Sequence, residues 1–196
     1  KMDKEKILEF LQRASQIDFE ELIFSEKGDL PSGKWLALQN FNAVRISIPL
    51  SGSVVQHIHF NGKWQQITCP VGRALVFLPM TWTAGSNEHP EMENLGIILN
   101  PGYLRLIASN LAENQQQQLP DYFFHQYTGI GAATRELFKT LTLWDNKYPS
   151  KVAGTLLTVL LKLLYTNLSA DSLEKIPRSN ILWRQIHSFL LEHFRD

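Results

Sequence analysis

Hydrophobic and polar positions change their spacing along the chain, and this change predicts where helices and strands lie. Residues 3–15 predict a short amphipathic helix, because Ile7, Leu8 and Leu11 recur at helical spacing. From residue 19 to residue 99, apolar positions come in short runs rich in β-branched and aromatic residues, with Gly, Pro and Asn between them. Such runs are typical of an antiparallel sandwich or barrel. The predicted strands are residues 21–25, 34–39, 43–50, 53–60, 63–69, 73–78 and 94–99.

The turn between the fourth and fifth runs is the clearest local signal. Asn61 and Gly62 separate these runs, and this dipeptide favours a type I′ hairpin because both turn residues need a positive φ. Side chains alternate in residues 43–50, where Arg45 and Ser47 lie opposite an apolar face. That face is formed by Val44, Ile46, Ile48 and Leu50.

Beyond Pro101 the apolar spacing indicates helices. A helix is predicted to start at Pro101 and Gly102, with Tyr103, Leu104, Ile107 and Leu111 on one side. The run of glutamines at residues 115–118 predicts a loop, and residues 121–127 a last extended stretch. Further helices are predicted at residues 132–144, 152–168 and 180–194.

The helix at residues 152–168 is apolar around most of its circumference. Such a helix needs cover on more than one side. Either the flanking helices of the same chain supply all of this cover, or the barrel covers one side and a second copy of the chain covers the other. We favour a homodimer that forms through helices within residues 132–168.

Composition and charge narrow the function. The chain has 196 residues, of which 44% are hydrophobic and 19% charged, as in ordinary globular proteins. Nineteen basic residues balance nineteen acidic ones, so this chain by itself lacks the basic excess typical of DNA-binding proteins. One cysteine, Cys69, fits a reducing, cytoplasmic compartment. We expect no secretory signal and no membrane span.

Two histidines are the strongest candidates for metal chemistry. His57 and His59 are two positions apart on a predicted strand, so their side chains share a face. With Gly52 before them and Gly72 and Pro79 after them, they resemble the metal motifs of the cupin superfamily. The resemblance implies a jelly-roll barrel.

Other positions depart from the cupin metal motifs. The glutamate position falls on Lys63 or Trp64, and the third histidine position falls on Ala84. Two ligands are fewer than a divalent catalytic site usually has. We therefore expect no metal, no cofactor and no enzymatic activity, and a metal-dependent cupin isomerase or dioxygenase stays the alternative.

Three stretches resemble the regulatory half of AraC-type transcription regulators. Residues 66–79 contain its Pro-x-Gly turn, apolar strand and second proline. Residues 100–107 resemble the end of its barrel, and residues 181–194 resemble its connecting helix. The resemblance implies an α+β chain in which residues 1–100 form an N-terminal helix and a cupin-like jelly-roll barrel. Residues 101–196 would then form a helical dimerisation and linker region.

In this family the barrel binds a small effector and a C-terminal helix-turn-helix domain binds DNA. We expect this DNA-binding domain to be absent from the chain. Contact with DNA would then need a C-terminal domain that these 196 residues do not include. A stand-alone metabolite-binding module is a further alternative. The predicted effector-binding residues are Trp35, Arg45, His57, His59, Trp64 and Trp82, although a one-residue shift of register would exchange the face of the sheet that lines the bore.

Overall fold

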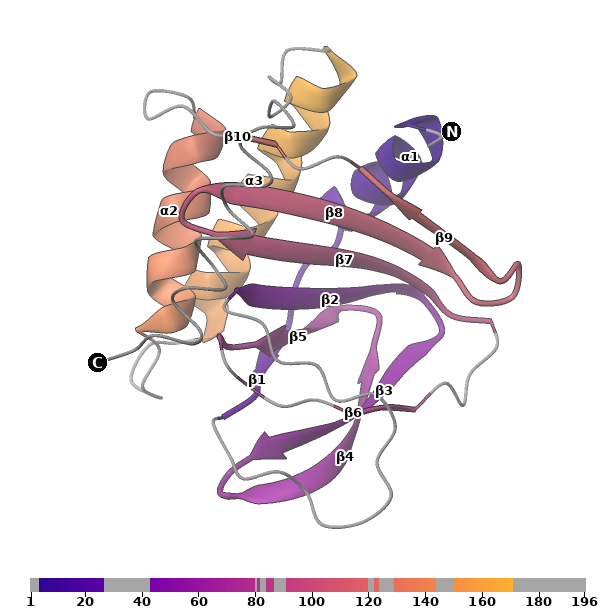
Figure 1. The fold of residues 1–196 in the computed structure, drawn as a ribbon, viewed down its shortest axis with the longest axis vertical. Helices are drawn as coiled ribbons and strands as arrows, with labels where there is room; N and C mark the ends of the chain where they lie inside the picture. The colour runs from indigo at the N-terminus through magenta and orange to yellow at the C-terminus, as the bar shows by residue number, and fades with distance from the viewer. Residues whose placement is uncertain are drawn as a thin grey trace, which may run out of the picture.

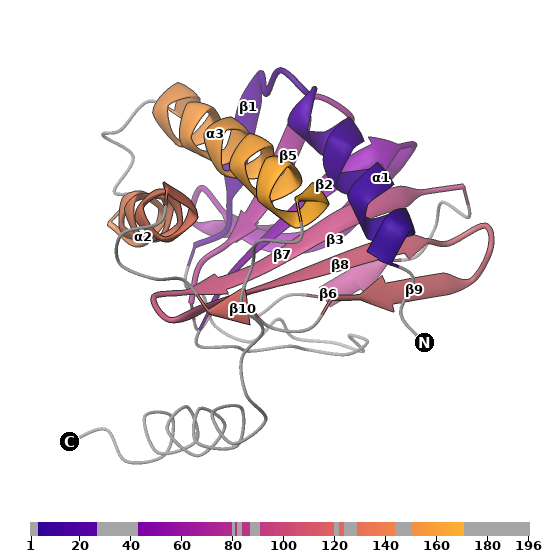
Figure 2. The same ribbon diagram turned by 90° about the horizontal axis from the view of Figure 1, so that it is seen from above.

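The chain folds into an α+β structure with three layers, helices on a large sheet and a small sheet on its other side (Figures 1 and 2). A computed structural model describes residues 4–26, 43–79, 81, 84–86, 91–119, 122–123, 129–143 and 150–170. The predicted strand at residues 34–39 and the predicted helix at residues 180–194 lie outside these ranges.

The large sheet has seven strands and is mixed. Its main path runs β1-β5-β2-β7-β8-β10, and β9 pairs with β8 as well. The β1–β5 pair is parallel and the other neighbours are antiparallel. The strands are β1 (Glu21–Phe24), β2 (Val44–Ser51), β5 (Arg73–Phe77), β7 (Glu93–Asn100), β8 (Tyr103–Asn110), β9 (Gln115–Gln118) and β10 (Tyr122–Phe123).

Three helices cover one face of this sheet, as Figure 2 shows. They are α1 (Lys4–Ser15), α2 (Gly129–Thr142) and α3 (Ser150–Ser169). Their positions confirm the helices predicted at residues 3–15, 132–144 and 152–168. Alternate side chains of β2, β7 and β8 pack against them in one apolar core, which includes Ile46, Ile97 and Leu106. This helix-covered face holds most of the buried apolar side chains.

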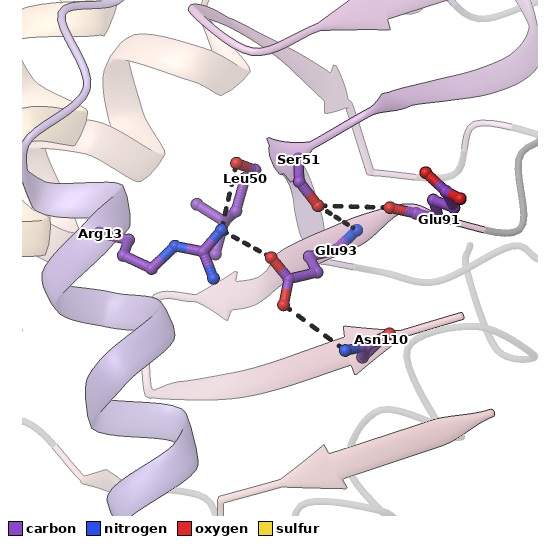
Figure 3. Close-up of polar contacts among 6 residues, drawn as sticks. All are labelled: Arg13, Leu50, Ser51, Glu91, Glu93 and Asn110. Atoms are coloured by element: carbon purple, nitrogen blue, oxygen red, sulfur yellow. Dashed lines mark hydrogen bonds and ion pairs between the residues drawn. The ribbon is translucent and has the colours of Figure 1, made fainter. Parts of the chain in front are cut away.

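A cluster of polar contacts, centred on the ion pair of Arg13 and Glu93, connects α1 to the end of the large sheet (Figure 3). Arg13 Nη2 lies 2.6 Å from Glu93 Oε2 and donates a hydrogen bond of 3.3 Å to the Leu50 carbonyl. The backbone N–H of Glu93 donates to Ser51 Oγ, and Asn110 Nδ2 donates to Glu93 Oε1. The hydrogen bond from Arg13 is the main reason that the pKa of Glu93 is lowered.

The small sheet has three strands in the order β4-β3-β6: β3 (Ser53–Phe60), β4 (Lys63–Pro70) and β6 (Ala84–Ser86). Asn61 and Gly62 have φ angles of 51° and 73°, which confirms the predicted hairpin with two positive-φ residues. A second, smaller core joins this sheet to the large one. It consists of Ile23, Val54, Ile58, Cys69, Leu75 and Phe77.

Several predictions about the strands are confirmed. The buried side chains of β2 alternate as expected, with Val44, Ile46 and Ile48 on the helix side. In β5, Val76 packs in the helix-side core and Leu75 in the core between the sheets, so this strand is covered on both faces.

Other predictions are wrong. The segment after Pro101 is not a helix but strand β8, which forms a hairpin with β7 through a turn at Pro101 and Gly102. The glutamines at residues 115–118 form strand β9 rather than a loop. The described strands form two open sheets, so closure into a barrel is not seen.

Helix α3 packs on α1 and α2 with part of its surface and exposes the rest. Val152 and Val159 are 46% and 44% exposed. By length and composition alone, Lys151–Ser169 is apolar enough to cross a membrane, but core helices of soluble proteins pass the same test. The fold accounts for Leu157, Leu160 and Leu164, which are buried in the core, and leaves Val152 and Val159 exposed.

Candidate functional site

The face of the large sheet that is turned toward the small sheet carries the polar groups. In β2, β7 and β8 its residues alternate with the side chains that pack under the helices, and they are half-buried. We call this surface the inner face. From β2, β7 and β8 it comprises Arg45, Ser47, Asn94, Gly96, Ile98, Arg105 and Ile107. In β5, by contrast, Leu75 and Phe77 are buried in the core between the sheets.

Strand register places four side chains in one row across the inner face. Phe77 of β5 pairs with Arg45, Arg45 pairs with Ile98, and Ile98 pairs with Arg105. Two strand spacings separate the two arginines, so their Cα atoms are about 10 Å apart. Their long side chains can therefore reach the same group if it lies above Ile98.

Arg45 is the best-defined member of this row. Its guanidinium carbon lies 4.9 Å from the centroid of the Phe77 ring, a cation–π contact. Burial lowers the pKa of Arg45 to about 10 because desolvation disfavours the charged form. The group is still protonated at neutral pH, so the inner face carries a partly desolvated positive charge.

Small side chains lie next to the arginine row. Ser47 pairs in register with Gly96, and Ser47 Oγ donates a hydrogen bond of 2.8 Å to Asn94 Oδ1. A Cβ atom added to Gly96 would meet no described atom closer than Ile107 at 3.6 Å, an ordinary van der Waals distance. Ser47 and Gly96 thus form two adjacent positions with little side-chain bulk, flanked in register by Leu75 and Ile107.

The two histidines lie elsewhere. Val54 and Ile58 of β3 pack in the core between the sheets, and His57 and His59 alternate with them, so both histidines point away from that core. Trp64 pairs with His59, and their ring centroids are 5.8 Å apart. Of the four predicted site residues that the structure describes, only Arg45 lies on the inner face.

Glu26 approaches the histidines from the end of β1. Its Oε2 lies 3.6 Å from His59 Nδ1, and its carboxylate accepts hydrogen bonds from the backbone N–H groups of Asn61 and Gly62. Among the described residues, no group of three or more His, Cys, Asp or Glu side chains is placed to hold a metal ion. Through its two hydrogen bonds to the backbone, the carboxylate of Glu26 stabilises the hairpin turn.

Trp35 and Trp82 lie outside the described residues, so their predicted role has no structural counterpart here. Two residues were missed by sequence reasoning, Arg105 and Glu26. Arg105 was hidden because its segment was assigned to a helix, although Leu104 and Leu106 alternate with it as in a strand. Glu26 carries no signal in the sequence, since only the fold brings it to the β3–β4 hairpin.

Cys69 is a structural residue. It is fully buried in the core between the sheets, and burial raises the pKa of its thiol to about 12. Because the thiolate is the reactive form, Cys69 has the properties of a small apolar side chain.

Comparisons with known proteins add no assignment. No family model matches the chain, and no match is found among curated proteins or among solved structures. The case for a function therefore depends on the geometry of this chain and on the resemblance of its motifs.

Proposed function

We propose that the chain is the ligand-sensing and dimerisation domain of an AraC-type transcription regulator. The proposed effector is a small molecule that binds on the inner face, within a cupin-like jelly roll. DNA contact would belong to a C-terminal domain outside these 196 residues, and the protein would act in the cytoplasm.

One observation carries this proposal: the two faces of the large sheet differ in the burial and polarity of their side chains. The helix side is closed by apolar packing, whereas the inner face keeps Arg45, Ser47, Asn94 and Arg105 half-buried. Small-molecule sites combine apolar surroundings with a few polar groups that orient the ligand. The inner face has this composition, with Ile98 and Ile107 as its half-buried apolar part.

The dimerisation part rests on α3. Val152 and Val159 are exposed and lie two helical turns apart, on the same side of α3. The α3 helix of a second copy would make apolar contact with this side. We expect sedimentation at micromolar concentration to show a dimer. Val159→Glu should shift the protein to monomers. Val71→Glu is the matched control, because Val71 is 48% exposed and lies in the β4–β5 turn instead of in α3. A monomeric wild-type protein would contradict this part.

The DNA-binding part is tested by the coding sequence beyond codon 196. We expect about a hundred further codons with two helix-turn-helix units and a basic surface. A stop codon directly after codon 196 would favour the stand-alone metabolite-binding module, which shares the same inner face.

A further inference from the structure

The inner face holds two cations in one row, with an apolar side chain between them. Arg45 and Arg105 both pair with Ile98, from opposite sides. Each guanidinium presents several N–H donors in a fixed plane. A ligand group above Ile98 can therefore accept hydrogen bonds from two directions.

The opposite face of the same strands provides the contrast. Its buried residues in β2, β7 and β8 are apolar throughout the core, so the sheet does not need charges to pack. Arginine is costly to desolvate, and Arg45 shows that cost in its lowered pKa. A ligand carboxylate would add charge-assisted hydrogen bonds to the contacts that Arg45 already makes.

We infer that the ligand of the inner face is a small carboxylate with an apolar body, held by the guanidinium groups of Arg45 and Arg105. The inference rests on the proposed function only in requiring a small molecule at this face, and it does not depend on DNA binding. The carboxylate would lie above Ile98 and the apolar body would lie over Ser47 and Gly96, where side chains are small.

The chemistry of the row favours a carboxylate. The planar, forked guanidinium matches the two oxygens of a carboxylate, and the bonds are charge-assisted. Ile98 and Ile107 are half-buried and offer contact to an apolar body rather than to a strongly hydrated ion. Inorganic phosphate shares the charge but has no apolar part, so it separates simple anion binding from recognition of the whole ligand.

The test uses benzoate as the probe and benzamide as its neutral match. We expect benzoate to raise the melting temperature by about 3 to 5 °C at ten times its dissociation constant. Benzamide and inorganic phosphate should give less than a quarter of that shift at equal concentration. Titration calorimetry then gives the dissociation constants.

Two variants place the binding at the proposed groups. Arg45→Met and Arg105→Met should each weaken benzoate binding about tenfold or more, because each removes charge-assisted hydrogen bonds. Arg135→Met is the matched control, since Arg135 belongs to α2 on the far side of the sheet, and it should leave binding unchanged.

A third variant keeps the test valid if an arginine variant unfolds. Gly96→Leu places a side chain where the apolar body would lie, and its Cβ meets only ordinary contacts. We expect it to abolish benzoate binding while the protein stays folded, and Gly96→Ala to weaken binding by less than about threefold.

The outcomes separate the two proposals. Equal binding of benzamide, or tighter binding of phosphate, would overturn the carboxylate and leave a ligand site on the inner face. Hexanoate serves as a second, aliphatic carboxylate probe. Both carboxylates are added at 20 times the protein concentration and up to about 20 mM, where a dissociation constant near 1 mM would be detected. If neither benzoate nor hexanoate binds under these conditions, the carboxylate proposal is also overturned. Neither result touches the oligomeric state or the coding sequence, on which the proposed function is tested independently.

Discussion

Along β7, Leu95, Ile97 and Leu99 pack against the helices, whereas Gly96 and Ile98 lie on the inner face. The same alternation separates Ile46 from Arg45 in β2 and Leu106 from Arg105 in β8. The two faces are thus made by the same strands and are covered by different layers. One face is closed and apolar, and the other keeps charged and small residues.

We propose that the helix side of the sheet serves stability and that the inner face serves binding. Apolar burial on the helix side supplies stability in proportion to the area removed from water. Charged side chains on the inner face add little stability when buried. Substitutions on the helix side should therefore change stability, and those on the inner face should change binding.

The largest expected effect is a difference in the free energy of unfolding between substitutions at two neighbouring isoleucines of β7, Ile97 and Ile98. Ile97→Ala should lower the free energy of unfolding by about 3 kcal/mol, because Ile97 is fully buried and its loss leaves a cavity. Ile98→Ala should cost about 1 kcal/mol, since Ile98 is only half-buried. Urea unfolding measures both, and equal losses would remove the distinction between the faces.

A smaller effect on the free energy of unfolding is expected at the ion pair of Arg13 and Glu93, which connects α1 to the sheet. Glu93→Gln should cost about 1 kcal/mol at pH 7, because it removes a charge-assisted pair with Arg13. The folded-state pKa of Glu93 lies below its ordinary value of 4.5. The pair therefore stabilises the fold above about pH 4.5, and this contribution is lost as the pH falls through the folded-state pKa.

The wild type and Glu93→Gln should accordingly converge in stability at acid pH. Unfolding by urea from pH 7 to pH 3 measures the convergence, and Glu136→Gln, on the exposed side of α2, is the control. A constant difference between wild type and Glu93→Gln across this range would contradict the role of the charge.

The smallest stability effect is expected on the inner face. Arg45→Met should change the free energy of unfolding by less than about 1 kcal/mol, because an apolar side chain of similar length avoids the cost of desolvating a charge. The same variant should lose benzoate binding. A loss above 2 kcal/mol in urea unfolding would mean that Arg45 belongs to the structural core.

Local sequence patterns predicted most of the described strands. Alternation in β2 and the Asn61–Gly62 turn were sufficient, because each depends on neighbouring residues alone. The pattern failed at β8, where Tyr103, Leu104 and Ile107 fit a helix as well as a strand. Pairing with β7 through the turn at Pro101 decides the outcome, and such pairing is a tertiary effect.

The candidate site was predictable only in part for the same reason. Arg45 was found because its strand was assigned correctly, whereas Arg105 was lost with the assignment of β8. His57 and His59 share a face as predicted, but the sequence does not specify which face of β3 meets the large sheet. Two-sheet packing fixes this choice through Val54 and Ile58.

Amide NMR during a benzoate titration tests the central claim most directly. We predict that the largest chemical-shift changes fall on the inner-face residues of β2, β7 and β8, namely Arg45, Ser47, Gly96, Ile98 and Arg105, and that the amides of α1 and α3 stay unchanged. Changes centred on the helices or on His57 and His59, or no changes at all, would contradict the assignment of binding to the inner face.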